Sequence, residues 1–263
     1  MLITRPDDPS FDDYRNLNDT TLRRRVEVDR GFFLVEGWQA VGRLLASDWP
    51  VRSVLVAAGK EHRIPPGSAP LHVAPPEVIT AVVGFDLHRG VIASVERRPD
   101  PGPAAVMGGA HTLGVLEGVT DAENLGAIFR SASALGVDGI LLDPVSGDPF
   151  YRRSVRVSMG AVLLVPWSRL RPWPEALEQV RKAGFRILAM TPHPAATDIA
   201  AVEPGGRTAI LLGSESRGLS RAARARADGE VRIPQRGVLD SLNVGHAAAI
   251  AFHRLAPPGP AGG

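Results

Sequence analysis

Five nearly continuous apolar runs occupy the second half of this 263-residue chain, and they constrain its fold more than any other feature. They are TLGVLEG (112–118), GILLD (139–143), VLLVPW (162–167), RILAM (186–190) and TAILLG (208–213), with helical patterns between them. Strands that are apolar on both faces are typical of a parallel sheet covered by helices on both sides. We therefore expect a doubly wound α/β domain, whose ligands bind beyond the carboxyl ends of the strands.

A Pro/Gly-rich stretch, RRPDPGPAAVMGGAH (97–111), precedes these runs and predicts an interdomain linker. Before it, FFLV and VRSVLVAA have the pattern of strands, GWQAVGRLLAS has helical spacing, LHVAPPEVITAVV predicts a strand and then a helix, and Asp19 can cap a basic helix. We expect a small α/β domain over 1–98, a linker over 99–110, the larger domain over 111–257 and a disordered tail over 258–263.

Composition excludes several classes of protein. The chain has no cysteine, which excludes disulfides, thiolate zinc sites and cysteine nucleophiles and fits a reducing compartment. Its polar start lacks the order of a secretory signal, and no apolar run approaches the ~18 residues of a membrane span, so we expect a cytoplasmic protein. The formal net charge is only +2. Two arginine clusters, TLRRRVEVDR (21–30) and FYRRSVR (150–156), suit a solvated face and RNA contact equally well.

Three loops combine glycine with small polar residues: DAENLGAIFR (121–130), GSESRGLS (213–220) and IPQRGVLDSLNVG (233–245). The spacing of Gly213 and Gly218 suggests a phosphate loop, but Leu219 stands where such a loop needs lysine. A dinucleotide fingerprint and a serine-hydrolase elbow are missing, and the seven histidines lack metal-ligand spacing, so we expect no metal. Loops of this kind can hold a neutral adenosine through main-chain hydrogen bonds.

Residues of the three loops follow a pattern. The first has Asn124, Gly126, Arg130 and then Gly136; the second has Gly213, Glu215, Gly218 and Leu219; the third has Ile233, Pro234, Gly237, Ser241, Leu242, Asn243 and Val244. In this order they resemble the motifs of the SpoU (TrmH-type) branch of the SPOUT RNA 2′-O-ribose methyltransferases. The chain departs from the family pattern at Gly245-His246, where Ser and a small apolar residue are usual, and at Gln235, where Met is common.

The resemblance implies an α/β fold with a C-terminal, mostly parallel sheet of the SPOUT type, tied in a trefoil knot that is a rare exception to unknotted chains. More loosely, FFLVEGWQAV and LHRGVIASV resemble the smaller, ribosomal-protein-like RNA substrate-binding domain that many family members carry at the N-terminus. Because family members complete their active site where two knots meet, we expect a homodimer through the C-terminal domain.

The resemblance also implies an activity, the transfer of methyl from S-adenosylmethionine to a ribose 2′-hydroxyl of rRNA or tRNA. It implies that the cofactor is bound by Leu212, Gly213, Gly218, Ile233, Gln235 and Leu242. The catalytic candidates that it implies are Arg130, Asn124, Glu215, Ser241 and Asn243.

Arg130 is the leading catalytic candidate. Arginine stays protonated in proteins, so a clamp on the adjacent phosphate that favours the developing alkoxide is physically easier than proton abstraction. Asn124 either holds the loop or ribose or simply caps a helix, and Glu215 either anchors the knot or Arg130 or has a purely structural role. The alternative function is a non-catalytic RNA-binding protein or ribosome-assembly factor that retains the fold; intact Arg130, Glu215 and Asn243 favour the enzyme.

Overall fold

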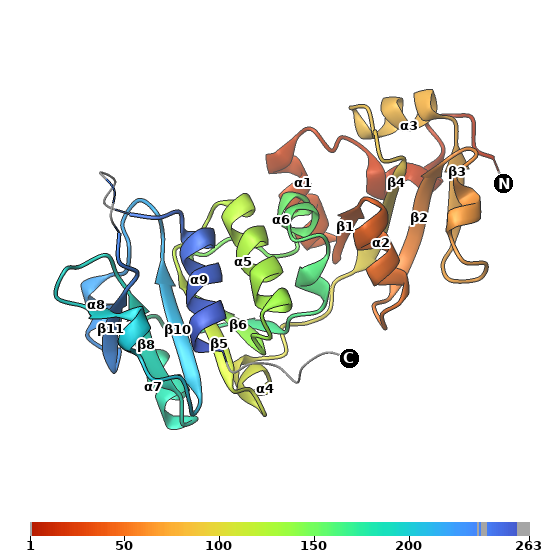
Figure 1. Ribbon diagram of the computed structural model, residues 1–263. Coiled ribbons are helices and arrows are strands. Elements are labelled where there is room, and N and C mark those ends of the chain that lie inside the picture. Colours follow the sequence, from red (N-terminus) through yellow and green to blue (C-terminus); the bar gives the residue numbers. More distant parts are fainter. Residues whose placement is uncertain (1, 236, 238–240, 257–263) are drawn as a thin grey trace. The chain divides into compact units, whose positions relative to one another are not determined.

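The computed structural model describes residues 2–235, 237 and 241–256, apart from the side chains of residues 20–24. The chain forms two compact units (Figure 1). The first unit contains residues 1–98 and 150–163, and the second contains 99–149 and 164–263. The expected tail and the side chains of the first arginines in the cluster at 21–30 lie outside the described residues. None of the helices in the described part is long and apolar enough to cross a membrane.

The first unit is built on a four-stranded mixed sheet in the order β1-β4-β2-β3. Strand β4 is antiparallel to both β1 and β2, whereas β3 is parallel to β2. The strands are β1 (Phe32–Glu36), β2 (Val51–Ala57), β3 (Leu71–Ala74) and β4 (Val91–Glu96). The helices are η1 (Pro9–Tyr14), α1 (Thr20–Asp29), α2 (Trp38–Leu45), η2 (Glu61–Arg63), α3 (Pro76–Val83), α6 (Arg152–Val157) and η3 (Ala161–Leu163). The strands and helices expected from the N-terminal patterns are therefore present.

Helices α6 and η3 belong to the first unit although they are distant from it in sequence. The Phe150 ring stacks on Phe33 of β1 with centroids 4.4 Å apart. Arg152 Nη1 lies 2.8 Å from Oε2 of Glu36, a carboxylate buried at the end of β1. A buried charge requires such a partner. The boundaries therefore differ from the single linker expected at 99–110, and Arg152 of the FYRRSVR cluster has a structural partner.

The second unit contains a seven-stranded sheet in the order β7-β6-β5-β10-β8-β11-β9, and every strand pairing is parallel. Its strands are β5 (Thr112–Glu117), β6 (Gly139–Leu142), β7 (Trp167–Arg169), β8 (Arg186–Met190), β9 (Thr197–Asp198), β10 (Thr208–Gly213) and β11 (Gly229–Arg232). The expected α/β fold with a mostly parallel sheet is confirmed. The strand predicted over 162–167 is wrong, because Val162 and Leu163 lie in the 3-10 helix η3 and the strand begins only at Trp167.

Helices cover both faces of this sheet. They are α4 (Pro103–Met107), α5 (Ala122–Ala134), α7 (Leu177–Lys182), η4 (Ile199–Ala201), α8 (Arg221–Arg224) and α9 (Val244–Leu255). Leu113 and Val115 of β5 pack into one core cluster with residues of α4 and α7. The intervening Gly114 points to the opposite face, where a Cβ would lie 3.2 Å from the ring of Phe252 in α9. Gly114 thus lets α9 pack closely on that face of the sheet, where it lies beside α5 (Figure 1).

Candidate functional site

The loop from β5 to α5 is the first of three loops that contribute residues to the site. Asp121 is the N-cap of α5, and its carboxylate accepts hydrogen bonds of 2.9 Å from the backbone N–H groups of Glu123 and Asn124. Aspartate is a favoured residue at this position because it satisfies the free donors of the first turn. The cap is therefore Asp121 rather than Asn124, which leaves the Asn124 side chain available for a contact outside its own helix.

The loop after β10 depends on two glycines for two different reasons. A Cβ on Gly213 would lie 2.3 Å from the carbonyl carbon of Gly218 and 2.4 Å from the nitrogen of Leu219, so the chain folds back directly onto Gly213. Gly218 has a φ of +63°, which favours glycine, and its N–H donates to the carbonyl of Ser214 over 2.8 Å. Together they form a tight turn that projects Glu215.

The third loop leads into α9 through Asn243. The Oδ1 of Asn243 accepts hydrogen bonds from the N–H groups of Gly245, at 2.9 Å, and His246, at 3.3 Å, and so caps α9. The side-chain amide of Asn243 points the other way and donates to Oδ1 of Asn124 over 2.8 Å and to Oε1 of Glu215. One residue from each of the three loops is therefore joined in a single hydrogen-bonded cluster, which we call the Asn243 cluster (Asn124, Glu215 and Asn243).

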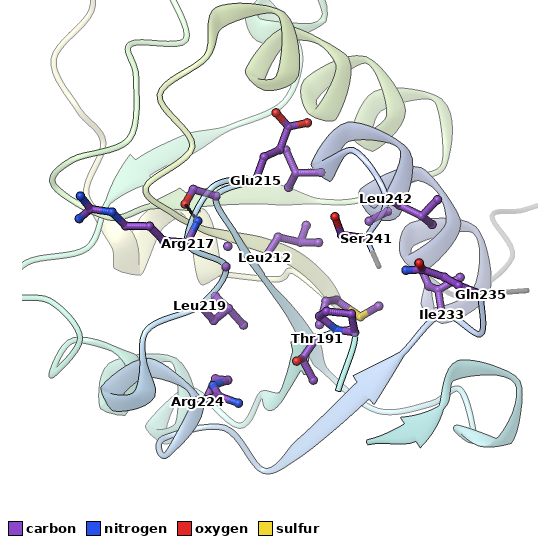
Figure 2. Close-up of a pocket in the computed structure, with 17 residues that line it drawn as sticks. Thr191, Leu212, Glu215, Arg217, Leu219, Arg224, Ile233, Gln235, Ser241 and Leu242 are labelled. Carbon is purple, nitrogen blue, oxygen red and sulfur yellow. Dashed lines mark hydrogen bonds between the residues drawn. The ribbon is translucent and has the colours of Figure 1, made fainter. Parts of the chain in front are cut away.

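A cavity of about 350 Å³ lies beside this cluster. Figure 2 shows its lining, to which the second and third loops contribute most of the side chains. The lining includes all six residues expected to bind the cofactor, Leu212, Gly213, Gly218, Ile233, Gln235 and Leu242, together with Glu215 and Ser241. Asn124, Asn243 and Arg130 are not part of the lining. Arg236 and residues 238–240 of the third loop lie outside the described residues.

The cavity opens where neighbouring strands separate. The register between β10 and β8 ends at Leu211 and Ala189, one residue before Leu212, and the register between β11 and β8 ends at Val231 and Met190. Beyond these pairs Leu212 and Gly213 of β10 still pair with β5 but no longer with β8, and both residues line the cavity. This is the carboxyl edge of the parallel sheet, where α/β proteins bind ligands.

Several lining residues escaped the sequence reasoning: Met190, Thr191, Pro192, Ser214, Arg217, Arg224, Val244 and Ala247. Among them Arg217 and Arg224 add two positive charges to the lining, and Nη1 of Arg224 is ion-paired with Glu230 at 3.4 Å. The turn after RILAM could have been recognised as one more carboxyl end of a strand. Its place next to TAILLG follows from the strand order, which the sequence does not reveal.

Glu117 is another residue that sequence reasoning missed. One carboxylate oxygen accepts a hydrogen bond from Nε1 of Trp173 at 2.7 Å, and the other accepts one from the backbone N–H of Ser220 at 2.8 Å. Glu117 thereby holds the start of α8 against the end of β5. Its signal in the sequence is a carboxylate at the end of a buried strand, at the edge where polar groups support ligand loops.

Arg130 stands apart from the rest of the site. It is exposed on α5, and within the described part of the chain its guanidinium has neither a hydrogen bond nor an ion pair. Six residues separate it from Asn124, which corresponds to about 9 Å along the helix and about 120° around it. The structure therefore brings together Asn124, Glu215 and Asn243, places Glu215 and Ser241 on the cavity, and leaves Arg130 elsewhere on the surface.

The departure at Gly245-His246 lies outside the cavity. A Cβ on Gly245 would come within 3.1 Å of the Cβ of Ala127 in α5 and of Asn243 Oδ1, and His246 is exposed. Gly245 therefore affects the packing of α9 on α5 and not the cavity lining. Among the described residues, no group of three or more histidine, aspartate or glutamate side chains could hold a metal ion.

Comparison with known proteins identifies a set of relatives. The profile of the SpoU rRNA Methylase family matches residues 112–253. An uncharacterized tRNA/rRNA methyltransferase of Mycobacterium tuberculosis is 44% identical over 259 residues, which covers 94% of this chain and 88% of the relative. A putative TrmH family tRNA/rRNA methyltransferase of Staphylococcus aureus is 32% identical over 56% of this chain and 59% of its own length.

Solved structures are similar over both units. The AdoMet-bound rRNA methyltransferase of Sinorhizobium meliloti has a TM-score of 0.80 and 25% identity, over 97% of this chain and 96% of that one. The SpoU methyltransferase AviRb of Streptomyces viridochromogenes, in complex with AdoMet, has a TM-score of 0.80 and 26% identity, over 94% of this chain and 97% of that one. Both of these structures hold S-adenosylmethionine.

Proposed function

Since this chain belongs to the SpoU rRNA Methylase family and is an RNA methyltransferase that uses S-adenosylmethionine, we propose that it methylates a ribose 2′-hydroxyl of rRNA or tRNA. The observation that carries this proposal is the Asn243 cluster, which joins the three loops at the rim of the cavity. A protein that only bound RNA would not need three separate loops to meet at a cofactor-sized cavity.

We propose that the cavity beside the Asn243 cluster holds the cofactor. Its volume of about 350 Å³ lies within the range of small-molecule sites. Apolar side chains such as Leu212, Ile233 and Leu242 suit the faces of an adenine ring, while Glu215 and Arg217 offer partners for the charged groups of the methionine portion. When bound, the cofactor supplies an electrophilic methyl group on a positively charged sulfur.

Arg130 is our proposed catalytic residue for the 2′-oxygen. A planar guanidinium can contact a phosphate and a neighbouring ribose oxygen together, and it stabilises the negative charge that develops on the attacking oxygen. Because Arg130 keeps its proton, it acts in this proposal by charge and orientation rather than as a base. Its exposure and lack of a partner in the described chain leave it available to RNA.

We further propose that a second copy of the chain completes the site. Arg130 and the Asn243 cluster lie on different sides of α5, so one chain does not bring this arginine to its own cavity. On the outer face of helix α9, Ile250 is 41% exposed, and Ala247 and Ala249 are partly exposed small residues that allow close helix approach. We propose a homodimer through this unit, with the third loop forming part of a trefoil knot.

The first unit is our proposed RNA-binding part, and the second the methyltransferase part. The division differs from a simple split by sequence, because α6 and η3 lie with the first unit. RNA affinity should fall steeply as the salt concentration rises, since phosphate contacts release counterions.

The experiment that tests the proposed function is single-turnover transfer of labelled methyl to RNA, with the modified position mapped as a base or a ribose. Arg130→Ala should lower the rate by about 100-fold or more, the scale of losing one electrostatic stabiliser, while cofactor binding by calorimetry stays unchanged. Arg130→Lys should restore little of the rate, because a point charge lacks the planar fork. Methylation of a base, or full turnover in the alanine variant, would refute the proposal.

A further inference from the structure

Trp38 and Arg63 form a stacked pair on the surface of the first unit. The guanidinium carbon of Arg63 lies 3.8 Å from the centre of the Trp38 ring. Trp38, the first residue of α2, is fixed in place because its Nε1 donates to the carbonyl of Arg89 over 2.7 Å. Arg63 ends the short helix η2 and is itself exposed. One face of the guanidinium thus covers the indole, and its position on the surface leaves the other side accessible.

A hollow of about 290 Å³ adjoins this pair. It is lined by Trp38, Val41, Gly42, Leu45, Ala46, Arg63, Ile64 and Pro65. The lining is apolar apart from Arg63, so it suits a flat, weakly polar group better than a charged one. Its volume falls just below the range of sites for whole small molecules, which fits a single nucleobase.

Arg89 lies beside Trp38, whose indole donates to its carbonyl, and Lys60 lies over Gly90, the residue that follows Arg89. The side chain of Arg89 lies over Gly37, with Nη1 2.9 Å from the position that a Cβ would occupy there, and Lys60 lies over Gly90 in the same way, with Nζ at 2.9 Å. Within the described part of the chain, Lys60, Arg63 and Arg89 form no ion pair. Their charges are therefore available to an anionic ligand, in contrast to Arg152, which is paired with Glu36.

We propose that this surface binds an unpaired nucleotide of the RNA substrate, with its base stacked on the Arg63 guanidinium and its phosphates beside Arg89 and Lys60. Bases of single-stranded RNA stack on aromatic rings and on arginine planes, whereas bases inside a duplex are inaccessible. The hollow accommodates the edge of the base. This inference rests on the proposed function, because it assigns to the first unit a preference for an unpaired segment of the RNA that the second unit methylates.

The test compares the full chain and its variants in binding to a fluorescent single-stranded RNA of about 12 nucleotides and to the same RNA in a duplex. Arg63→Lys keeps the charge and removes the stacking plane, so it should weaken single-strand binding about tenfold, the order that stacking contributes per base. Duplex binding and the salt dependence should stay as in the wild type. Trp38→Ala, which removes the support of the guanidinium, should have the same effect. Arg186→Lys, exposed at the start of β8 in the second unit, is the matched control.

Three outcomes separate the possibilities. Selective loss of single-strand affinity in Arg63→Lys, with the control unchanged, supports the stacking site. Wild-type binding by Arg63→Lys, or an equal loss for single strand and duplex, overturns it and leaves the proposed methyltransferase function standing. If the wild type binds neither RNA but still binds S-adenosylmethionine, RNA recognition by the first unit fails as well. Circular dichroism of each variant excludes unfolding as the cause, and Arg63→Lys keeps the test valid even if Trp38→Ala does not fold.

Discussion

Asn243→Asp gives the sharpest test of the Asn243 cluster, because the two roles of this residue predict changes of opposite sign in the stability of the second unit. As a helix cap, aspartate is as good as asparagine and interacts favourably with the helix dipole, so a capping role alone predicts unchanged or slightly higher stability. In the cluster the same change removes the amide that donates to Asn124 and Glu215 and sets a second carboxylate against that of Glu215. The cluster therefore predicts destabilisation.

The magnitude of this destabilisation follows from three contributions. A lost hydrogen bond to a charged group costs about 1.5 kcal/mol at the low end, which is appropriate because Asn243 and Glu215 are exposed. Two carboxylates about 4 Å apart repel by about 1 kcal/mol in a water-like dielectric, and the gain from the helix dipole offsets about 0.5 kcal/mol. The net loss is about 2 kcal/mol, or a fall of about 4–8 °C in Tm for a unit of this size.

Thermal unfolding of the wild type, Asn243→Asp, Glu215→Gln and the double variant forms the assay. The transition that S-adenosylmethionine raises identifies the unit that holds the cofactor. Glu215→Gln alone should have little effect, because its amide oxygen can still accept from Asn243. In the double variant the donor and acceptor roles are exchanged, so stability should return to within about 0.5 kcal/mol of the wild type. An Asn243→Asp variant as stable as the wild type, or no rescue in the double variant, would refute the cluster.

Two other predictions concern the turn after β10 and the assembly. Gly213→Ala should reduce both the stability of the second unit and its affinity for S-adenosylmethionine, since a methyl group at this position meets the backbone of Gly218 and Leu219 within 2.5 Å. Gly218→Ala has open space around its Cβ, so it should cost only the ~1–2 kcal/mol of a left-handed residue. Equal losses of stability and cofactor affinity in the two variants, measured by calorimetry, would contradict this ranking. Light scattering should give a dimer at micromolar concentration, and a fully active monomer would remove the need for a second copy at the site.

Local chemistry made much of this fold predictable. The parallel sheet followed from apolar runs such as RILAM and TAILLG, because strands buried on both faces leave a continuous apolar signature. The prediction for VLLVPW failed for the same reason: a short buried apolar run has no period that separates a strand from a buried turn of helix. In the structure, its Val162 and Leu163 form a buried 3-10 turn in the first unit.

The candidate site was likewise predictable from the sequence only in part. Glycines and small polar residues after buried strands indicated which loops line the cavity, since parallel strands end at one edge. The meeting of Asn124, Glu215 and Asn243 joins positions that are 28 and 119 residues apart, and no local pattern encodes such a distance. Likewise the pairing of Glu36 with Arg152 spans 116 residues, so the membership of α6 in the first unit was not predictable from composition.

The packing of two helices connects the fold to the site. Helices α5 and α9 lie side by side, and Gly245 is in the contact, where a Cβ would lie 3.1 Å from the Cβ of Ala127. That distance is tighter than ordinary contact, so a larger residue would push the helices apart by some tenths of an ångström. Such a shift matters at the start of α9, because the hydrogen bond between Asn243 and Asn124 is 2.8 Å long and weakens with small displacements. A glycine at 245 therefore acts on the site through the distance between two helices, without contacting the cavity.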